Sequence, residues 1–272
     1  MGTEADRPRA RRARYRSEGD GTGRGEETMM TERDLGTVRA LTFDVFGTVV
    51  DWRRSVRDAL AAWFEPRGTT RDWEAFALDW RALYRPSMAA VREGERDFVV
   101  LDVLHRESLV TVLDAHDVHG LSSVELDELT GIWHRLEPWP DVRPALARLA
   151  SHYRLATLSN GHVELMRNLA RHADLPWHVI LGAEPTRSYK PEPDAYLRSA
   201  AMLCLEPEQC MMVAAHNDDL DAARALGFRT AYVNRPEEYG TRQTRDIAAE
   251  SDWDVVTDSF AGLAGALLDS SV

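Results

Sequence analysis

The sequence predicts an α/β fold in which a doubly wound parallel sheet carries an inserted helical domain. From residue 139 to the C-terminus, short apolar runs alternate with amphipathic segments, an order typical of a parallel sheet with helices on both faces. Between residues 52 and 139 the apolar residues keep helical spacing instead. A chain of 272 residues is long enough to bury a core in both units. We therefore expect the helical block to form a small separate domain over an edge of the sheet.

The first strand and the helical block open the globular part of the chain. VRALTFDVF, at residues 38–46, is a short apolar run rich in Val, Phe and Thr, which suits a buried strand. Turn signals at Pro66–Gly68, Pro86, Gly94 and Gly120 divide the block that follows. The helices predicted between those signals span residues 55–64, 73–84, 98–116 and 123–136.

The rest of the chain supplies the alternating elements. Helices are predicted at residues 140–153, 163–173, 191–205 and 219–227, with a last one near the C-terminus. Strands are predicted at residues 154–162, 177–184, 210–218 and 229–235, and WDVVTD at residues 253–258 adds an edge strand. The domain boundaries that follow are 37–51 with 140–272 for the core, 52–139 for the helical cap and 1–36 for a tail.

The tail has a different composition from the rest of the chain. It is polar, rich in Arg and Gly, and without an apolar face, so we expect it to be disordered. No apolar segment follows Arg11–Arg12, which argues against a secretory signal. We expect residues 1–29 to be dispensable, with Met29 or Met30 as the natural start. A basic arm that binds a polyanion is the alternative.

Composition narrows the classes of partner. The formal net charge is −12, which disfavours nucleic acid. No apolar run reaches 18 residues, so no membrane span is expected. Cys204 and Cys210 have neither the spacing of a zinc site nor that of a disulfide framework. Two reduced thiols fit a cytoplasmic protein.

Polar side chains follow several of the predicted strands. In open parallel sheets, ligands bind beyond the carboxyl ends of the strands, so these residues are candidates for one site. The candidates at strand ends are Asp44, Thr48, Ser159, Asn160 and Asp219, and a nearby loop adds Lys190 and Tyr196. Each also has a structural explanation: a helix cap for the Asp, Ser and Asn residues, a turn for Thr48 and solvent exposure for Lys190.

Four segments carry a resemblance to a known family. FDVFGT, LSNG, YKPEPDAY and VAAHNDDLDAARALGF resemble the four motifs of the haloacid dehalogenase superfamily. The match covers about residues 38–262 and is most similar to the type II (S)-2-haloacid dehalogenases. The resemblance implies a Rossmann-like hydrolase core with a helical cap, and an aspartate nucleophile at Asp44.

Two positions separate the phosphatases of this superfamily from its dehalogenases. The phosphatases carry a second Asp two residues after the nucleophile, as a general acid for the leaving alkoxide; here that position is Phe46. A halide needs no proton. In the fourth motif, Ala214, Ala215 and His216 replace the phosphatase pattern Gly-Asp-Ser, which removes a Mg²⁺-supporting carboxylate. We therefore expect a site without metal or cofactor, in which Lys190 supplies the positive charge.

The resemblance also implies roles for the candidate residues. Arg81, which follows Trp80 on a predicted cap helix, is expected to cradle the departing halide with Asn160. Arg85 lies four residues further on, on the same helix face, and is a rival for Arg81. The substrate-binding set is Phe46, Ser159, Asn160 and Tyr196, with Ser159 and backbone N–H groups holding the substrate carboxylate.

The hydrolytic step involves a second group of residues. Asp219 is expected to help activate the water, Lys190 to orient the carboxylates, and Thr48 to support them. Type II dehalogenases carry Ser and Asn where this chain has Ala214 and His216. His216 is therefore either a hydrogen-bond donor, a general base or a structural residue.

The predicted function is metal-independent hydrolysis of a short (S)-2-haloacid to a 2-hydroxy acid through an aspartyl ester. The alternatives are a phosphatase that acts on a small phosphorylated metabolite, and a non-catalytic relative. The predicted partner is a small halogenated carboxylic acid, with neither nucleic acid nor membrane. A homodimer is an expectation from the family.

Overall fold

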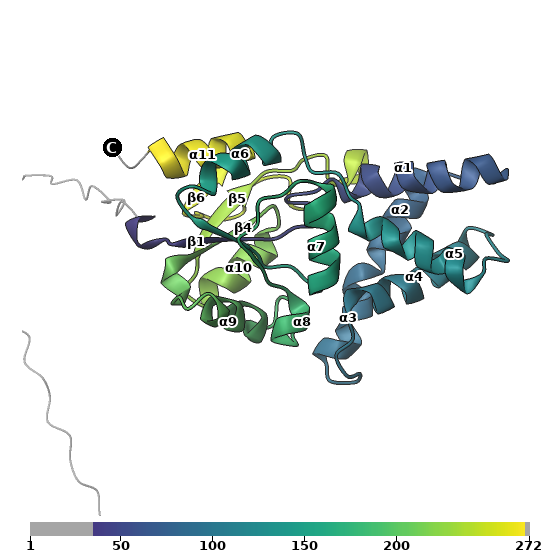
Figure 1. Ribbon diagram of the computed structural model, residues 1–272, viewed down its shortest axis with the longest axis horizontal. Coiled ribbons are helices and arrows are strands. Elements are labelled where there is room, and N and C mark those ends of the chain that lie inside the picture. Colours follow the sequence, from purple (N-terminus) through teal and green to yellow (C-terminus); the bar gives the residue numbers. More distant parts are fainter. Residues whose placement is uncertain (1–34, 270–272) are drawn as a thin grey trace, which may run out of the picture. The chain divides into compact units, whose positions relative to one another are not determined.

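The structure is a computed structural model and describes residues 35–269. Its core contains a six-stranded, all-parallel sheet between helices, and the helices within residues 52–130, labelled α1 to α5, lie to one side of this core (Figure 1). The strands are β1 (Ala40–Phe43), β2 (Arg154–Thr157), β3 (Val179–Ile180), β4 (Cys210–Ala214), β5 (Arg229–Val233) and β6 (Val255–Thr257). Their order in the sheet is β3-β2-β1-β4-β5-β6. The predicted doubly wound parallel sheet is confirmed. The predicted tail falls almost entirely on residues 1–34, outside the described residues.

The direction of winding reverses at β1. The chain runs from β1 outward through β2 and β3 on one side, and returns to β4 on the other. β1 and β4 pair in register, with Phe43 opposite Val213, so the residues that follow these two strands emerge side by side. Such a reversal point is where open α/β sheets bind ligands.

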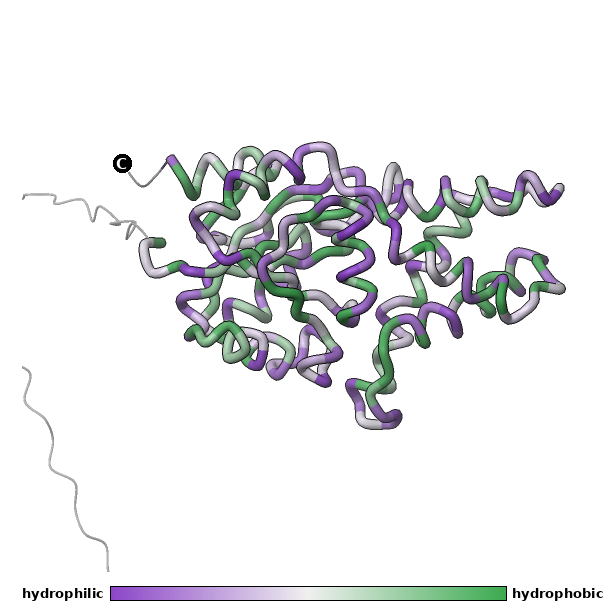
Figure 2. Tube along the Cα trace, viewed as in Figure 1, coloured by the Kyte–Doolittle hydropathy of each residue, from purple (hydrophilic) through white to green (hydrophobic). Residues whose placement is uncertain are grey.

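Alternate residues of the strands face two different hydrophobic cores. In β4, Met211 and Val213 belong to one core, whereas Cys210, Met212 and Ala214 belong to the other, as the two-residue period of a strand requires. The first core includes residues of α6 (Val142–Leu149), α7 (Val163–His172) and α11 (Phe260–Leu268), and the second includes residues of α9 (Pro193–Met202) and α10 (Asn217–Ala225). Figure 2 shows the resulting hydrophobic colouring along the strands.

The cap between β1 and β2 is helical, as predicted. Its helices are α1 (Trp52–Phe64), α2 (Trp73–Ala82), α3 (Tyr84–Arg92), α4 (Leu101–Ala115), α5 (Ser123–Thr130) and the 3-10 helix η3 (Gly131–His134). No helix among residues 35–269 is long and apolar enough to cross a membrane.

The predicted break between helices at Pro86 is wrong. The segment predicted as a single helix at residues 73–84 ends at Ala82, and α3 begins at Tyr84. Pro86, interpreted as a separator between helices, lies in the first turn of α3, where its missing N–H removes no helical hydrogen bond. Arg85 therefore lies on a different helix from Arg81, which corrects the expectation that the two share one helix face.

Candidate active site

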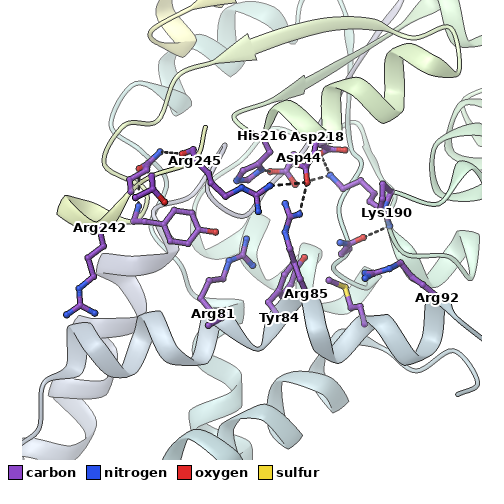
Figure 3. Close-up of a pocket in the computed structure, with 18 of the residues that line it drawn as sticks. Asp44, Arg81, Tyr84, Arg85, Arg92, Lys190, His216, Asp218, Arg242 and Arg245 are labelled. Atoms are coloured by element: carbon purple, nitrogen blue, oxygen red, sulfur yellow. Dashed lines mark hydrogen bonds and ion pairs between the residues drawn. The ribbon is translucent and has the colours of Figure 1, made fainter. Parts of the chain in front are cut away.

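A cavity of about 500 Å³ lies at the carboxyl ends of β1 and β4 (Figure 3). Core residues Asp44, Lys190, His216 and Asp219 line it, and Arg81 and Tyr84 line it from cap helices α2 and α3. Arg85, Arg92, Arg242 and Arg245 also line it. The cavity therefore gathers cationic side chains in a protein of net charge −12, which favours an anionic ligand.

Asp44 directly follows β1, and both of its carboxylate oxygens are held. Lys190 Nζ donates to Oδ1 at 2.9 Å, while Thr48 Oγ1 donates to Oδ2 at 2.7 Å and His216 Nδ1 lies 3.2 Å from Oδ2. Burial by itself would raise the pKa of Asp44, but the charge of Lys190 and the hydrogen bond from His216 lower it well below its ordinary value. Asp44 is therefore an ionised carboxylate with a fixed direction, as a nucleophile requires.

Lys190 bridges two carboxylates. Its ammonium group donates to Asp219 Oδ2 as well as to Asp44, and Tyr196 Oη donates to the other Asp219 oxygen at 2.6 Å. Burial opposes the charge on Lys190, but Asp219 and Asp44 raise its pKa above the ordinary value. The backbone N–H of Lys190 donates to Asn160 Oδ1 at 2.7 Å. The loop after β2 thus fixes the lysine.

Thr48 acts through hydrogen bonds and does not line the cavity. Its hydroxyl donates to Asp44 and accepts the backbone N–H of Ala215 at 2.9 Å. Because Ala215 follows β4, this hydroxyl ties the ends of the two central strands together. Thr48 therefore does more than close a turn, because its hydroxyl contacts both Asp44 and Ala215.

Glu238 is a buried partner of His216 that the sequence reading missed. Its Oε2 lies 2.9 Å from His216 Nε2, and Trp52 Nε1 donates to Oε1 at 2.8 Å. The side chain is only 1% exposed. A Cβ on Gly47 would lie 2.2 Å from Glu238 Oε1, so glycine is needed there. Glu238 follows β5, and the strand-end rule that selected Asp44 could have selected this loop as well.

His216 therefore sits between two carboxylates. Burial lowers the pKa of an imidazole, but here the charge of Glu238 and the hydrogen bond to Asp44 raise the pKa of His216 well above its ordinary value. His216 is an imidazolium while Asp44 is ionised. This state suits hydrogen-bond donation to Asp44 and not proton acceptance.

Arg81 lies in the last turn of α2, within an aromatic surround. Its guanidinium carbon is 4.0 Å from the ring centroid of Tyr84, 5.2 Å from that of Trp52 and 5.9 Å from that of Phe46. The residue is 8% exposed, and its Nη1 has no hydrogen-bond partner among the described residues. A buried N–H group without a partner is costly, so this one marks where an anion would bind.

Arg85 occupies the rim. It donates to Asp218 Oδ2 at 2.6 Å, and both side chains are about half exposed, at 55% and 43%. This ion pair connects α3 of the cap to α10 of the core. Arg81, and not Arg85, is thus the buried arginine of the cavity.

Two predicted substrate-binding residues lie beside the cavity and do not line it. Phe46 is 1% exposed and packs edge-on against Trp133 and Tyr84, with ring centroids 5.8 and 6.2 Å apart. Ser159 Oγ accepts the backbone N–H of Gly161 at 3.2 Å. Phe46 therefore joins cap to core beneath Arg81, and Ser159 shapes the loop that presents Asn160.

The capping alternatives for the strand-end residues are not observed. The helix after β2 has His162 at its N-cap, without a side-chain cap bond there, and Glu184 accepts the N–H of Val163. Asp219 lies within α10, whose N-cap is His216. Asn160, Tyr196 and Asp219 instead line the cavity.

Comparison with known proteins defines the class to which this fold and site belong. A family model for haloacid dehalogenase-like hydrolases matches residues 38–227, so the chain belongs to that family of hydrolases. Among solved structures it is similar to a defluorinating L-2-haloacid dehalogenase, with 46% identity, a TM-score of 0.83, and coverage of 85% of this chain and 95% of the other. The predicted similarity to (S)-2-haloacid dehalogenases is confirmed.

Curated relatives span more than one chemistry. The (S)-2-haloacid dehalogenase of Xanthobacter autotrophicus is 29% identical over 202 residues, which cover 73% of this chain and 76% of that protein. An enolase-phosphatase of Sorangium cellulosum is 30% identical over 226 residues, which cover 78% of this chain and 94% of that protein. Family membership alone therefore leaves the leaving group open.

Proposed function

We propose that the protein hydrolyses a short (S)-2-haloacid to a 2-hydroxy acid through an ester on Asp44, without a metal ion. The observation that carries this proposal is that one cavity holds both an ionised Asp44, whose two oxygens accept hydrogen bonds, and Arg81, whose Nη1 has no hydrogen-bond partner among residues 35–269. The similarity to L-2-haloacid dehalogenases supports the choice of substrate.

The ammonium of Lys190 takes the place of a cation. It contacts the carboxylates of Asp44 and Asp219 at once, where a Mg²⁺ ion would need several oxygen ligands. Position 215, next to the strand end, is alanine. This donor set fits a magnesium ion poorly, and no step in the proposal passes through one.

In the first step an oxygen of Asp44 attacks the carbon that carries the halogen. A carbon–oxygen bond forms, the carbon–halogen bond breaks, and the electron pair leaves with the halide in an in-line displacement. Negative charge grows on the halogen in the transition state, where the Arg81 guanidinium stabilises it more than in the ground state. Asn160 also lines this cavity and supports the halide.

In the second step water attacks the carboxyl carbon of the Asp44 ester. Ester formation removes the charge of Asp44, one of the causes that hold the pKa of His216 high, while the charge of Glu238 remains. The His216 imidazolium then gives its Nδ1 proton to solvent. The neutral ring takes a proton from the attacking water at Nδ1 and returns it to the leaving alkoxide, and the proton left on the freed Asp44 carboxyl group passes to His216, which restores the resting ion pair. Glu238 orients the ring through Nε2.

Asp219 takes a different part from the one that the sequence suggested. Both of its carboxylate oxygens are engaged, one by Lys190 and the other by Tyr196. We therefore assign water activation to His216, and to Asp219 the positioning of Lys190.

Two assays test the proposal. Halide release from (S)-2-chloropropionate in the presence of EDTA is expected, together with little phosphate release from p-nitrophenyl phosphate with Mg²⁺. The reverse pattern would establish the phosphatase alternative, and activity in neither assay would point to the non-catalytic one.

The ester on Asp44 has its own test. A single turnover in ¹⁸O water is expected to label Asp44 before the product, and full turnover by Asp44→Asn would exclude the ester.

A further inference from the structure

Three possible metal ligands meet where the cap joins the core. Asp102 lies in the first turn of α4, His134 ends η3, and His162 is the N-cap of α7. One ligand atom from each side chain lies within 4.8 Å of the others. Asp102 and His134 line a cleft of about 660 Å³ that shares no lining residue with the cavity around Asp44.

The spacing of these atoms is close to that of a zinc site. Asp102 Oδ2 lies 2.9 Å from His134 Nε2 and 3.5 Å from His162 Nε2. Zinc bonds to nitrogen and oxygen are about 2.0–2.2 Å long in tetrahedral sites, which places neighbouring ligand atoms about 3.3 Å apart. A small outward movement of the side chains would therefore admit the ion.

The two histidines are prepared for this role in different ways. His162 is 6% exposed, and its Nδ1 has no hydrogen-bond partner in the described part of the chain. His134 Nδ1 lies 3.0 Å from the Asn168 amide. With that amide rotated, its oxygen would accept Nδ1–H and orient the ring toward the metal.

A plain ion pair accounts for less of this arrangement. His134 alone satisfies Asp102, since its Nε2 contacts both carboxylate oxygens at 2.9 and 3.1 Å. An ion pair between Asp102 and His134 therefore does not explain why the buried imidazole of His162 lies beside the same carboxylate.

We propose that Asp102, His134 and His162 bind one Zn²⁺ ion that ties the cap to the core. Two imidazoles and one carboxylate suit zinc better than magnesium or calcium. Glu164 lines the same cleft, so either it or water completes the coordination. The ion is structural and separate from the hydrolytic chemistry, and the proposal does not rest on the proposed function.

The test uses the full-length protein without an affinity tag, stripped with EDTA and then titrated with Zn²⁺ alone. One equivalent is expected to bind, measured by competition with a chromophoric chelator, and to raise Tm. Co²⁺ at the same site is expected to show the visible absorption of a four-coordinate ion. Asn168→Ala is expected to weaken Zn²⁺ binding ~10-fold, because it loosens only the orientation of His134.

Variants separate this site from surface binding. Asp102→Asn, which preserves shape, and His162→Ala are each expected to abolish the stoichiometric binding and the rise in Tm. His119→Ala is the matched control, because its ring is 63% exposed and faces Asp114 at 3.8 Å; it is expected to bind like the unaltered protein. Circular dichroism verifies that each variant is folded. Equal Zn²⁺ binding by Asp102→Asn and the unaltered protein, or less than one equivalent in the latter, would overturn the proposal.

Discussion

The two sides of Asp44 hold the same carboxylate with different cations. On the Oδ1 side lies Lys190, whose pKa two carboxylates raise, so it stays charged at every working pH. On the Oδ2 side lies His216, whose pKa is raised by the charges of Glu238 and Asp44, and ester formation removes the second of these charges. The lysine side suits the displacement, which needs constant charge. The histidine side suits the hydrolysis, which needs a proton to move.

Removal of the lysine is expected to have the largest effect on the two sides of Asp44. Lys190→Met leaves Asp44 and Asp219 buried without their shared cation. We expect ester formation to slow by roughly 10³-fold and the free energy of unfolding to fall by about 3–5 kcal/mol. Single-turnover kinetics and urea unfolding measure the two effects.

Lys190→Arg is the informative companion variant. Lys190 is the only lysine in the sequence, among 33 basic residues of the Lys and Arg types. A planar guanidinium does not match the compact ammonium between two carboxylates, so this variant should also lose most activity. Near-native turnover by either variant would contradict the role assigned to Lys190.

Glu238→Gln tests the histidine side. Without the Glu238 charge the pKa of His216 falls toward its ordinary value. We expect kcat to drop by roughly 10–100-fold as the ring loses its orienting partner, with the ester accumulating. The pH at which ester hydrolysis rises should move lower. Rapid quench with mass spectrometry of the Asp44 peptide follows the ester, and a slower first step with no accumulated ester would count against this assignment.

The same variant changes the dependence of stability on pH. A histidine whose folded pKa is raised stabilises the fold fully below about pH 6.5 and loses this contribution as pH rises through the folded pKa. The unaltered protein should therefore have a higher free energy of unfolding than Glu238→Gln, and this difference should be larger at about pH 6 than at about pH 10. Urea titrations at both pH values measure the difference, and a constant gap would mean that Glu238 does not raise the pKa of His216.

Gly47→Ala tests how closely Glu238 must approach. Gly47 has φ of +94°, and a Cβ there would lie 2.2 Å from Glu238 Oε1. The strain and the clash together should lower the free energy of unfolding by about 2–4 kcal/mol. Gly68→Ala is the matched control, because Gly68 has φ of +78° but no atom within 4 Å of the added Cβ. Equal losses in both variants would show that only backbone strain matters.

Arg85→Gln should have the smallest effect. Its ion pair with Asp218 is half exposed, and such pairs contribute at most about 1 kcal/mol. We expect kcat to change less than about threefold at moderate salt, and KM to rise at low salt, where the cationic rim attracts an anion. Steady-state kinetics at two ionic strengths measure this, and a large fall in kcat would move Arg85 into the role assigned to Arg81.

The sequence alone determined the sheet, the cap insertion and the charged residues at the centre of the cavity, which are Asp44, Arg81, Lys190, His216 and Asp219. The spacing of apolar residues along the chain predicts each helix and strand. Because ligands bind beyond the carboxyl ends of parallel strands, Asp44, Lys190 and Asp219 could be predicted to lie together without knowledge of the side-chain packing. The interpretation of Pro86 as a break between helices failed, because proline is compatible with the first turn of a helix as well as with a loop.

Only the tertiary structure decided which residues that are far apart in the sequence contact each other. Glu238 lies in a loop 22 residues after His216, and nothing in its local composition marks it as buried beneath Gly47. Phe46 is set aside from the cavity by packing against Trp133, and Asp102, His134 and His162 meet through the docking of cap on core. Such contacts depend on the packing of whole elements, which periodicity along the chain does not record.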